Sequence, residues 1–162
     1  MTLPFLQIGS PQSWKTLLLA ASVASLSSIA KADSHTAGDP VAGEQNFSKC
    51  KTCHIIEADD GTLVQKGGKV GPNLWGLPGR QAGGAEGFKS SKSLAAAGEA
   101  GLIWSAETFA AFVADPSGYL KEVLEDPKAK SKKSLRYRDD PADLWAYLVS
   151  VSPAADTKLT DN

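Results

Sequence analysis

The sequence is poor in the residues that most often bind metals or cross-link a chain. Its 162 residues include two cysteines, two histidines and a single methionine, Met1. Two cysteines allow at most one disulfide, which excludes a disulfide-rich scaffold. The formal net charge of −1 gives no indication of a nucleic-acid partner. The length predicts one domain, and the composition is that of an ordinary globular protein.

Long hydrophobic runs are also missing, apart from one near the start of the chain. Residues 17–30 read LLLAASVASLSSIA, follow Lys15, and end in Ala30-Lys31-Ala32. The run is shorter than the roughly 20 mostly apolar residues of a membrane-spanning helix. A basic residue, a short apolar stretch and an A-x-A site are typical of a secretory signal peptide. We therefore expect residues 1–32 to be removed after Ala32 and the remaining chain to be periplasmic.

The two cysteines lie in one motif, Cys50-Lys51-Thr52-Cys53-His54. A CxxC pair can form a disulfide, a thioredoxin-like redox centre or half of a zinc site. Zinc would need four ligands, and the exported chain has only one further histidine, His35. No β-rich run precedes Cys50, as a thioredoxin-like site would require. The adjoining His54 completes C-x-x-C-H, the attachment signal of c-type haem. The two thiols would bind the porphyrin edge, and the imidazole of His54 would bind the iron.

Helix signals flank this motif on both sides. Asp39-Pro40 and Asp140-Pro141 each combine an N-cap acid with proline at the first helical position. The first predicted helix runs to the haem motif, and the last covers ADLWAYLVSV with one apolar face. A third is predicted over 106–115, capped by Ser105 and ended by Pro116, and a short fourth over 117–125. Residues 54–103 show no strand-length alternation. The sequence predicts an all-α domain of four to five short helices and long loops around the haem.

With these features in order, the chain resembles a class I cytochrome c across residues 39–152, and within it the long bacterial cytochrome c-two subgroup. Residues 33–38 and 153–162 would be tails. Gly43 and Phe47, with Leu144 and Tyr147, resemble the residues where the first and last helices cross. The resemblance implies a class I cytochrome c fold, one covalently attached haem c, and electron transport rather than enzymatic catalysis.

Three further residues acquire roles through this resemblance. The segment Gly71-Pro72-Asn73-Leu74-Trp75-Gly76 is similar to the family's GPNLxG motif. In the family, the proline carbonyl accepts the N–H of the proximal histidine, which assigns this role to Pro72. Arg80 would neutralise a haem propionate, and the indole N–H of Trp104 would reach a propionate.

The chain departs from the family where the second iron ligand is expected. The family's distal loop carries a methionine, whereas the matching stretch here is Ser131-Lys132-Lys133-Ser134-Leu135. Lys133 occupies the methionine position and would have to bind as a neutral amine. The alternatives are a vacant or water-bound site, or a ligand from His35, Lys132 or Lys130. Phe112 and Ser90-Ser91 also stand where the family has tyrosines, including the one that bonds the methionine sulfur.

The missing methionine changes the expected chemistry. Thioether ligation raises a haem potential, so an amine in its place predicts a lower one. Six of the eleven residues in Lys128–Arg138 are Lys or Arg. Together with Lys49 and Lys51, this segment predicts a basic docking face for redox partners. An open sixth position would instead favour a protein that binds CO, NO or peroxide, with weak peroxidase-like activity. A subunit of a larger redox enzyme is a third possibility that the sequence leaves open.

Overall fold

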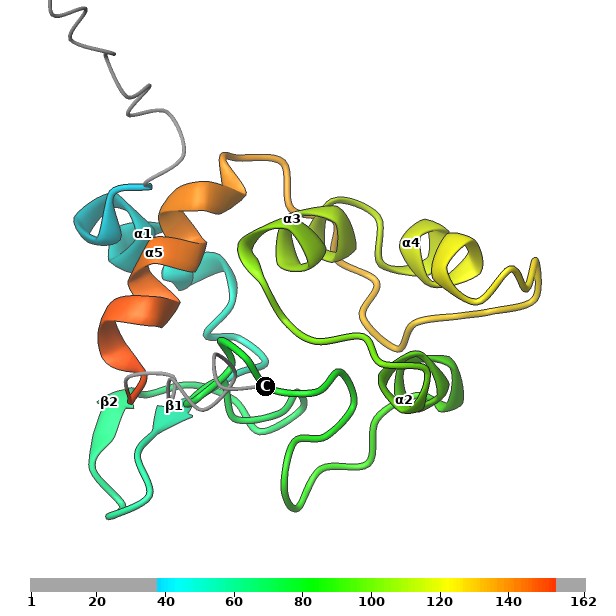
Figure 1. Ribbon diagram of the computed structural model, residues 1–162. Coiled ribbons are helices and arrows are strands. Elements are labelled where there is room, and N and C mark those ends of the chain that lie inside the picture. Colours follow the sequence, from blue (N-terminus) through cyan, green and yellow to red (C-terminus); the bar gives the residue numbers. More distant parts are fainter. Residues whose placement is uncertain (1–37, 154–162) are drawn as a thin grey trace, which may run out of the picture. The chain divides into compact units, whose positions relative to one another are not determined.

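The computed structural model describes residues 38–153, so the predicted signal peptide, His35 and the last nine residues lie outside the described part. The described chain contains the helices α1 (Pro40–Asn46), α2 (Lys92–Glu99), α3 (Ala106–Ala114), α4 (Pro116–Val123) and α5 (Pro141–Val151) (Figure 1). A 3₁₀ turn, η2 (Phe47–Lys49), continues α1. The predicted all-α fold is confirmed, and α1 ends earlier than expected because the chain tightens before Cys50. None of these helices is long and apolar enough to cross a membrane.

Three of the helices begin at the same sequence signal. The carboxylates of Asp39, Asp115 and Asp140 each accept a backbone N–H of the first turn, and proline follows each acid. Proline costs nothing there because the first N–H groups of a helix have no intrahelical partner. Ser105 and Thr108 form a capping box at α3. Caps of this kind contribute about 1 kcal/mol each, which matters for helices of seven to eleven residues.

Three elements, two strands and helix α2, were not predicted from the sequence. Strands β1 (Ile56–Glu57) and β2 (Leu63–Gln65) pair as an antiparallel hairpin with an irregular register. They are too short to produce an alternating pattern. Helix α2 begins at Ser91, whose hydroxyl accepts the N–H of Leu94 at 3.1 Å. Of the two serines in the stretch where the resemblance implies a tyrosine, Ser91 therefore serves as a helix cap.

The predicted crossing of the first and last helices is confirmed. Helices α1 and α5 pack directly together, although they are far apart in sequence (Figure 1). A Cβ at Gly43 would lie 2.0 Å from the carbonyl oxygen of Asp143, so only glycine allows this approach. Beside it, the rings of Phe47 and Tyr147 are 5.8 Å apart. Leu144, Tyr147 and Leu148 of α5 are all buried.

Candidate functional site: a haem cavity

The CxxCH motif lies at the tight turn that follows η2. The N–H of His54 donates to the carbonyl of Cys50 at 3.0 Å, and that of Cys53 donates to the same carbonyl at 3.0 Å. This turn holds both thiols and the imidazole on one short stretch of chain. Cys50 is half-buried and Cys53 is exposed, and no disulfide joins the two. Burial raises the pKa of the Cys50 thiol, and the charge of Lys133 partly opposes this.

The imidazole of His54 is fixed from behind by the segment around Pro72. Its Nδ1 lies 2.8 Å from the carbonyl oxygen of Pro72. A carbonyl can only accept, so Nδ1 carries the proton and Nε2 keeps the free lone pair that a metal requires. Burial lowers the pKa of His54, which favours the neutral, ligating form. Gly71 packs against the ring so closely that a Cβ there would lie 2.3 Å from Cε1.

His54, Cys50 and Cys53 line a cavity of about 440 Å³, a volume in the range of cofactor sites. Most of its wall is apolar and comes from α3, α5 and the long loops. Its lining includes Phe47, Leu74, Leu77, Leu94, Trp104, Phe109, Phe112, Val113, Leu144 and Leu148. Within residues 38–153, no cluster of three His, Cys, Asp or Glu could hold a metal by itself. An apolar slot with two thiols and one imidazole suits haem c, which brings its own equatorial ligands.

Arg80 and Trp104 meet at one wall of this cavity. The backbone N–H of Trp104 donates to the backbone carbonyl of Arg80 at 3.0 Å, which joins the two segments. The guanidinium of Arg80 donates to the carbonyls of Trp75 at 3.0 Å and Asn73 at 3.1 Å. Burial lowers the pKa of Arg80, and it has no acidic partner among residues 38–153. The cation therefore lies beside the cavity without a counter-charge.

Lys133 lines the same cavity as His54, from the loop that crosses between α4 and α5. Its side chain is half-buried, and its Nζ donates to the carbonyl of Leu135 at 2.7 Å. Burial lowers the pKa of Lys133, while Cys50 and Cys53 raise it. Lys132 also lines the cavity, but it is exposed, and its Nζ donates to the carbonyl of Lys89 at 2.8 Å. Lys130 is exposed and is not among the cavity residues.

Tyr137 is a cavity residue that the sequence analysis missed. It is 7% exposed, and its hydroxyl is buried without a hydrogen-bond partner among the described residues. Burial, followed by the charge of Asp139, raises its pKa to about 12. The available signal was an aromatic residue within a lysine-rich loop, because a fully exposed loop would gain nothing from an aromatic side chain and its presence there indicates a buried position.

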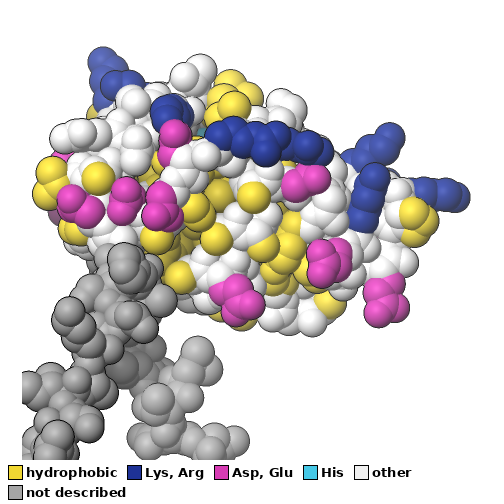
Figure 2. Space-filling view, turned by 90° about the horizontal axis from the view of Figure 1, so that it is seen from above, with side chains coloured by type: hydrophobic (Ala, Val, Ile, Leu, Met, Phe, Trp, Pro, Cys, Tyr) yellow, Lys and Arg dark blue, Asp and Glu magenta, His cyan; other side chains and the backbone are white. Residues whose placement is uncertain are grey.

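The predicted basic residues lie on the surface, but not all are free. Lys49 forms an ion pair with Asp139, and Arg136 pairs with Asp115 at 3.0 Å. Lys51, Lys128, Lys130, Lys132 and Arg138 are exposed. In the face shown by Figure 2, the Lys and Arg side chains gather along one edge, while Asp and Glu lie mostly away from it. The charge distribution is therefore uneven over this face.

Comparison with known proteins gives consistent relatives. No protein-family model matches the chain. Cytochrome c-551 of Roseobacter denitrificans is 51% identical over 115 residues, covering 71% of this chain and 82% of that protein. Cytochrome c2 of Rhodobacter capsulatus is 47% identical over 137 residues, covering 85% and 98%. A solved variant of ferric cytochrome c-550 from Paracoccus versutus, with lysine replacing a methionine, has a TM-score of 0.70 at 41% identity, covering 73% and 99%.

Two relatives are thus more than 45% identical and are matched over more than four fifths of their own length, which shows common descent and a common fold. Cytochromes of this kind carry electrons through one haem c, and Cys50 and Cys53 have the spacing that attaches it. The chain therefore belongs to the class I cytochromes c, as a monohaem electron carrier rather than an enzyme, with its haem c bound covalently through Cys50 and Cys53.

Proposed function

We propose that this cytochrome is a periplasmic electron carrier whose iron is ligated by His54 and Lys133, and that it works at a lower potential than its methionine-ligated relatives. The observation that carries the proposal is that Lys133 is half-buried at the cavity that His54 lines, whereas Lys49 and Lys132, which also line it, are exposed, in a chain whose single methionine is Met1. The bound haem supplies a one-electron Fe(III)/Fe(II) couple. The chain's own residues set how stable each of the two states is.

His54 supports this role through its hydrogen bond to Pro72. A proton held on Nδ1 keeps Nε2 available, and a carbonyl acceptor makes the imidazole a better donor to a metal. Arg80 and Trp104 are proposed to face the propionates. The lack of an acidic partner for Arg80 among residues 38–153 favours this, because a half-buried cation is costly until a counter-charge is present.

Lys133 must lose its proton to act as a ligand. From the ordinary pKa of about 10.4, this costs about 4.6 kcal/mol at pH 7. Burial already lowers the pKa of Lys133 and so reduces this cost. The opposing effect of Cys50 and Cys53 requires thiolate charge, which thioether formation removes. The cytochrome c-550 variant with lysine in place of a methionine keeps the fold, which is further support.

The decisive experiment compares Lys133→Ala with Lys132→Ala in the purified haem protein. We expect the parent to show a six-coordinate, low-spin ferric spectrum, which Lys133→Ala loses and Lys132→Ala retains. Lys133→Met should raise the reduction potential, within the ~0.8 V range that axial ligands span. An unchanged spectrum in Lys133→Ala would exclude Lys133. A change confined to Lys132→Ala would assign the ligand to Lys132.

The alternative of a small-molecule-binding haem protein is not favoured, because the relatives are cytochromes c2, c-550 and c-551. A high-spin ferric spectrum in the parent, shifted by CO after reduction, would restore that alternative.

Export is supported by the A-x-A site at Ala30-Lys31-Ala32. Fractionation followed by N-terminal sequencing should recover a chain that begins at Asp33 from the periplasm. Recovery of the intact chain from the cytoplasm would contradict this.

Docking at the basic face is proposed to involve Lys49, Lys51 and Lys128–Arg138. Exposed cations near the haem edge would steer acidic partners, and salt would screen the attraction. Electron transfer to an acidic redox protein should therefore slow as ionic strength rises, and less steeply in Lys51→Gln. A rate independent of salt would argue against a charged docking face.

A further inference from the structure

The segment that carries Lys133 has little backbone support. We define the distal loop as residues 131–136. Backbone–backbone hydrogen bonds flank it, from Ala129 to Asp126 at 3.0 Å and from Tyr137 to Val113 at 2.8 Å. Within residues 38–153, no such bond is made by the distal loop itself. Its position therefore depends on its side-chain contacts.

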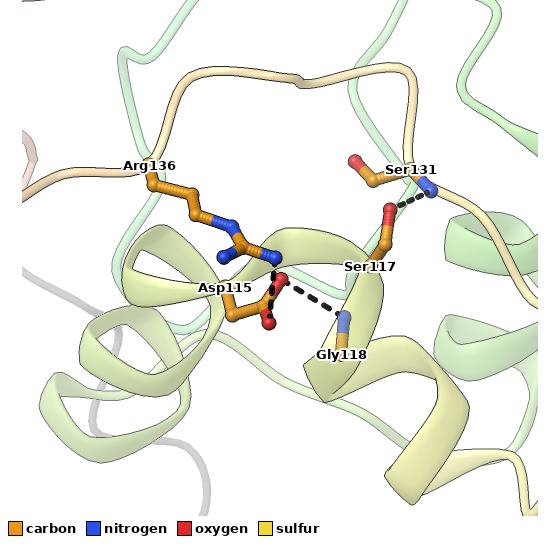
Figure 3. Close-up of polar contacts among 5 residues, drawn as sticks. All are labelled: Asp115, Ser117, Gly118, Ser131 and Arg136. Carbon is orange, nitrogen blue, oxygen red and sulfur yellow. Dashed lines mark hydrogen bonds and ion pairs between the residues drawn. The ribbon is translucent and has the colours of Figure 1, made fainter.

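Two contacts fix the ends of the distal loop to the start of α4 (Figure 3). At one end, the N–H of Ser131 donates to the hydroxyl of Ser117 at 3.1 Å. At the other, the Nη2 of Arg136 donates to the Oδ2 of Asp115 at 3.0 Å. Asp115 and Ser117 are two residues apart, at the N-cap and in the first turn of α4. The loop is thus held over one rigid helix end.

Asp115 is itself held in place. Its Oδ1 accepts the N–H of Gly118 at 3.1 Å, while Oδ2 is left for Arg136. One carboxylate therefore both caps α4 and anchors the loop. Inside the anchored stretch, the N–H of Lys133 donates to the hydroxyl of Ser131 at 3.0 Å. The backbone of Lys133 is tied to one anchored end, and two residues separate it from the other.

An exposed ion pair on its own contributes little to stability. Here the partners are only about half exposed, and the pair closes a loop whose backbone is otherwise unsupported. We propose that Asp115 and Arg136 are positioning residues for the sixth iron ligand, and that they hold the distal loop where Lys133 reaches the iron. This inference rests on the proposed ligation by Lys133. It adds that the start of α4 controls how readily that ligand is released.

The test is the binding of imidazole to the ferric haem protein. An added ligand can bind only after Lys133 has left, so its rate reports the release of Lys133. Arg136→Gln removes the charge and keeps the α4 cap, and we expect imidazole to bind about two- to fivefold faster. Asp115→Asn keeps a capping oxygen and should give the same increase. Combining the two should add nothing, because both remove one interaction.

Controls separate this effect from net charge and from folding. Lys121→Gln removes one cation from α4, away from the distal loop, and should leave the rate unchanged. Arg136→Lys should restore most of the parent rate. Hydrogen exchange of the amides of Ser131 and Lys133, which donate to the hydroxyls of Ser117 and Ser131, gives an independent readout and should rise in Arg136→Gln. Imidazole binding and exchange both equal to the parent in Arg136→Gln would overturn the proposal, as would an equal acceleration by Lys121→Gln.

The ferric spectrum of Lys133→Ala distinguishes failure of the ligand assignment from failure of the positioning role of Asp115 and Arg136. If Lys133→Ala leaves the ferric spectrum unchanged, Lys133 is not the ligand and the positioning role is overturned with it. If Lys133→Ala does lose the low-spin spectrum, Arg136→Gln should have no effect on imidazole binding in that background, since no ligand remains to be released. A persisting acceleration there would show that Arg136 acts on access to the cavity and would overturn its role through Lys133.

Discussion

Replacing Gly43 with alanine should destabilise the crossing of α1 and α5. Two effects of opposite sign compete. Alanine in a helix is favoured over glycine by about 1 kcal/mol. The added methyl, however, would lie 2.0 Å from the carbonyl oxygen and 2.6 Å from the carbonyl carbon of Asp143, and 2.7 Å from the Cβ of Tyr147. Overpacking of this kind costs about 1–3 kcal/mol.

The upper end of that range applies because the two nearest obstructing atoms belong to the backbone of Asp143, which cannot rotate away. The two helices must separate, which also loosens the contact between Phe47 and Tyr147. The expected net loss is about 2 kcal/mol of unfolding free energy, which corresponds to a decrease in melting temperature on the order of 5 to 10 °C.

Denaturant and thermal unfolding of the haem protein, followed by circular dichroism, provide the measurement. Gln45→Ala is a matched control, since Gln45 is exposed on the same helix and should change stability by no more than about 0.5 kcal/mol. If Gly43→Ala were as stable as the parent, helix propensity would outweigh the steric term. The close approach would then not be what requires glycine at this position.

Two predictions concern pH. Lys133 must be neutral to bind iron, so acidification should weaken its ligation about tenfold per pH unit and abolish the low-spin ferric spectrum of the parent. Lys133→Ala should lack this transition. The same transition in both proteins would contradict the assignment. For Tyr137, the pKa is raised to about 12 from an ordinary value near 10, so its stabilising effect is present below about pH 10 and is lost as pH rises toward 12. The unfolding free energy of the parent should therefore fall more steeply above pH 10 than that of Tyr137→Phe, and parallel curves from chemical denaturation would show that Tyr137 does not titrate in this way.

Much of the fold could be predicted because its signals are local. Asp39-Pro40 and Asp140-Pro141 mark helix starts by capping chemistry that needs no tertiary contact. The hairpin of β1 and β2 could not be predicted, because two or three residues are too few for a pattern. Helix α2 begins at Ser91 in a stretch rich in Gly, Ser and Lys, where composition alone indicates a loop.

The site divides in the same way. Cys50, Cys53 and His54 lie within five residues of sequence, so their spacing alone indicates haem attachment. The contribution of Tyr137 depends on burial, which a single residue in a charged loop does not reveal. The pairing of Arg136 with Asp115 joins positions 21 residues apart, and no local pattern encodes it.

The crossing of α1 and α5 has a consequence for how the domain opens. The two helices come from opposite ends of the described chain and pack directly together, and Phe47, which follows α1, joins Leu144, Tyr147 and Leu148 of α5 in one core. Fraying from either end would therefore expose the same interface and remove the support of the opposite end. The two terminal helices should behave as one cooperative unit that opens in a single event. The ends of a domain are usually its first parts to unfold, but the terminal helices of residues 38–153 are here among the parts that depend most on the rest of the domain.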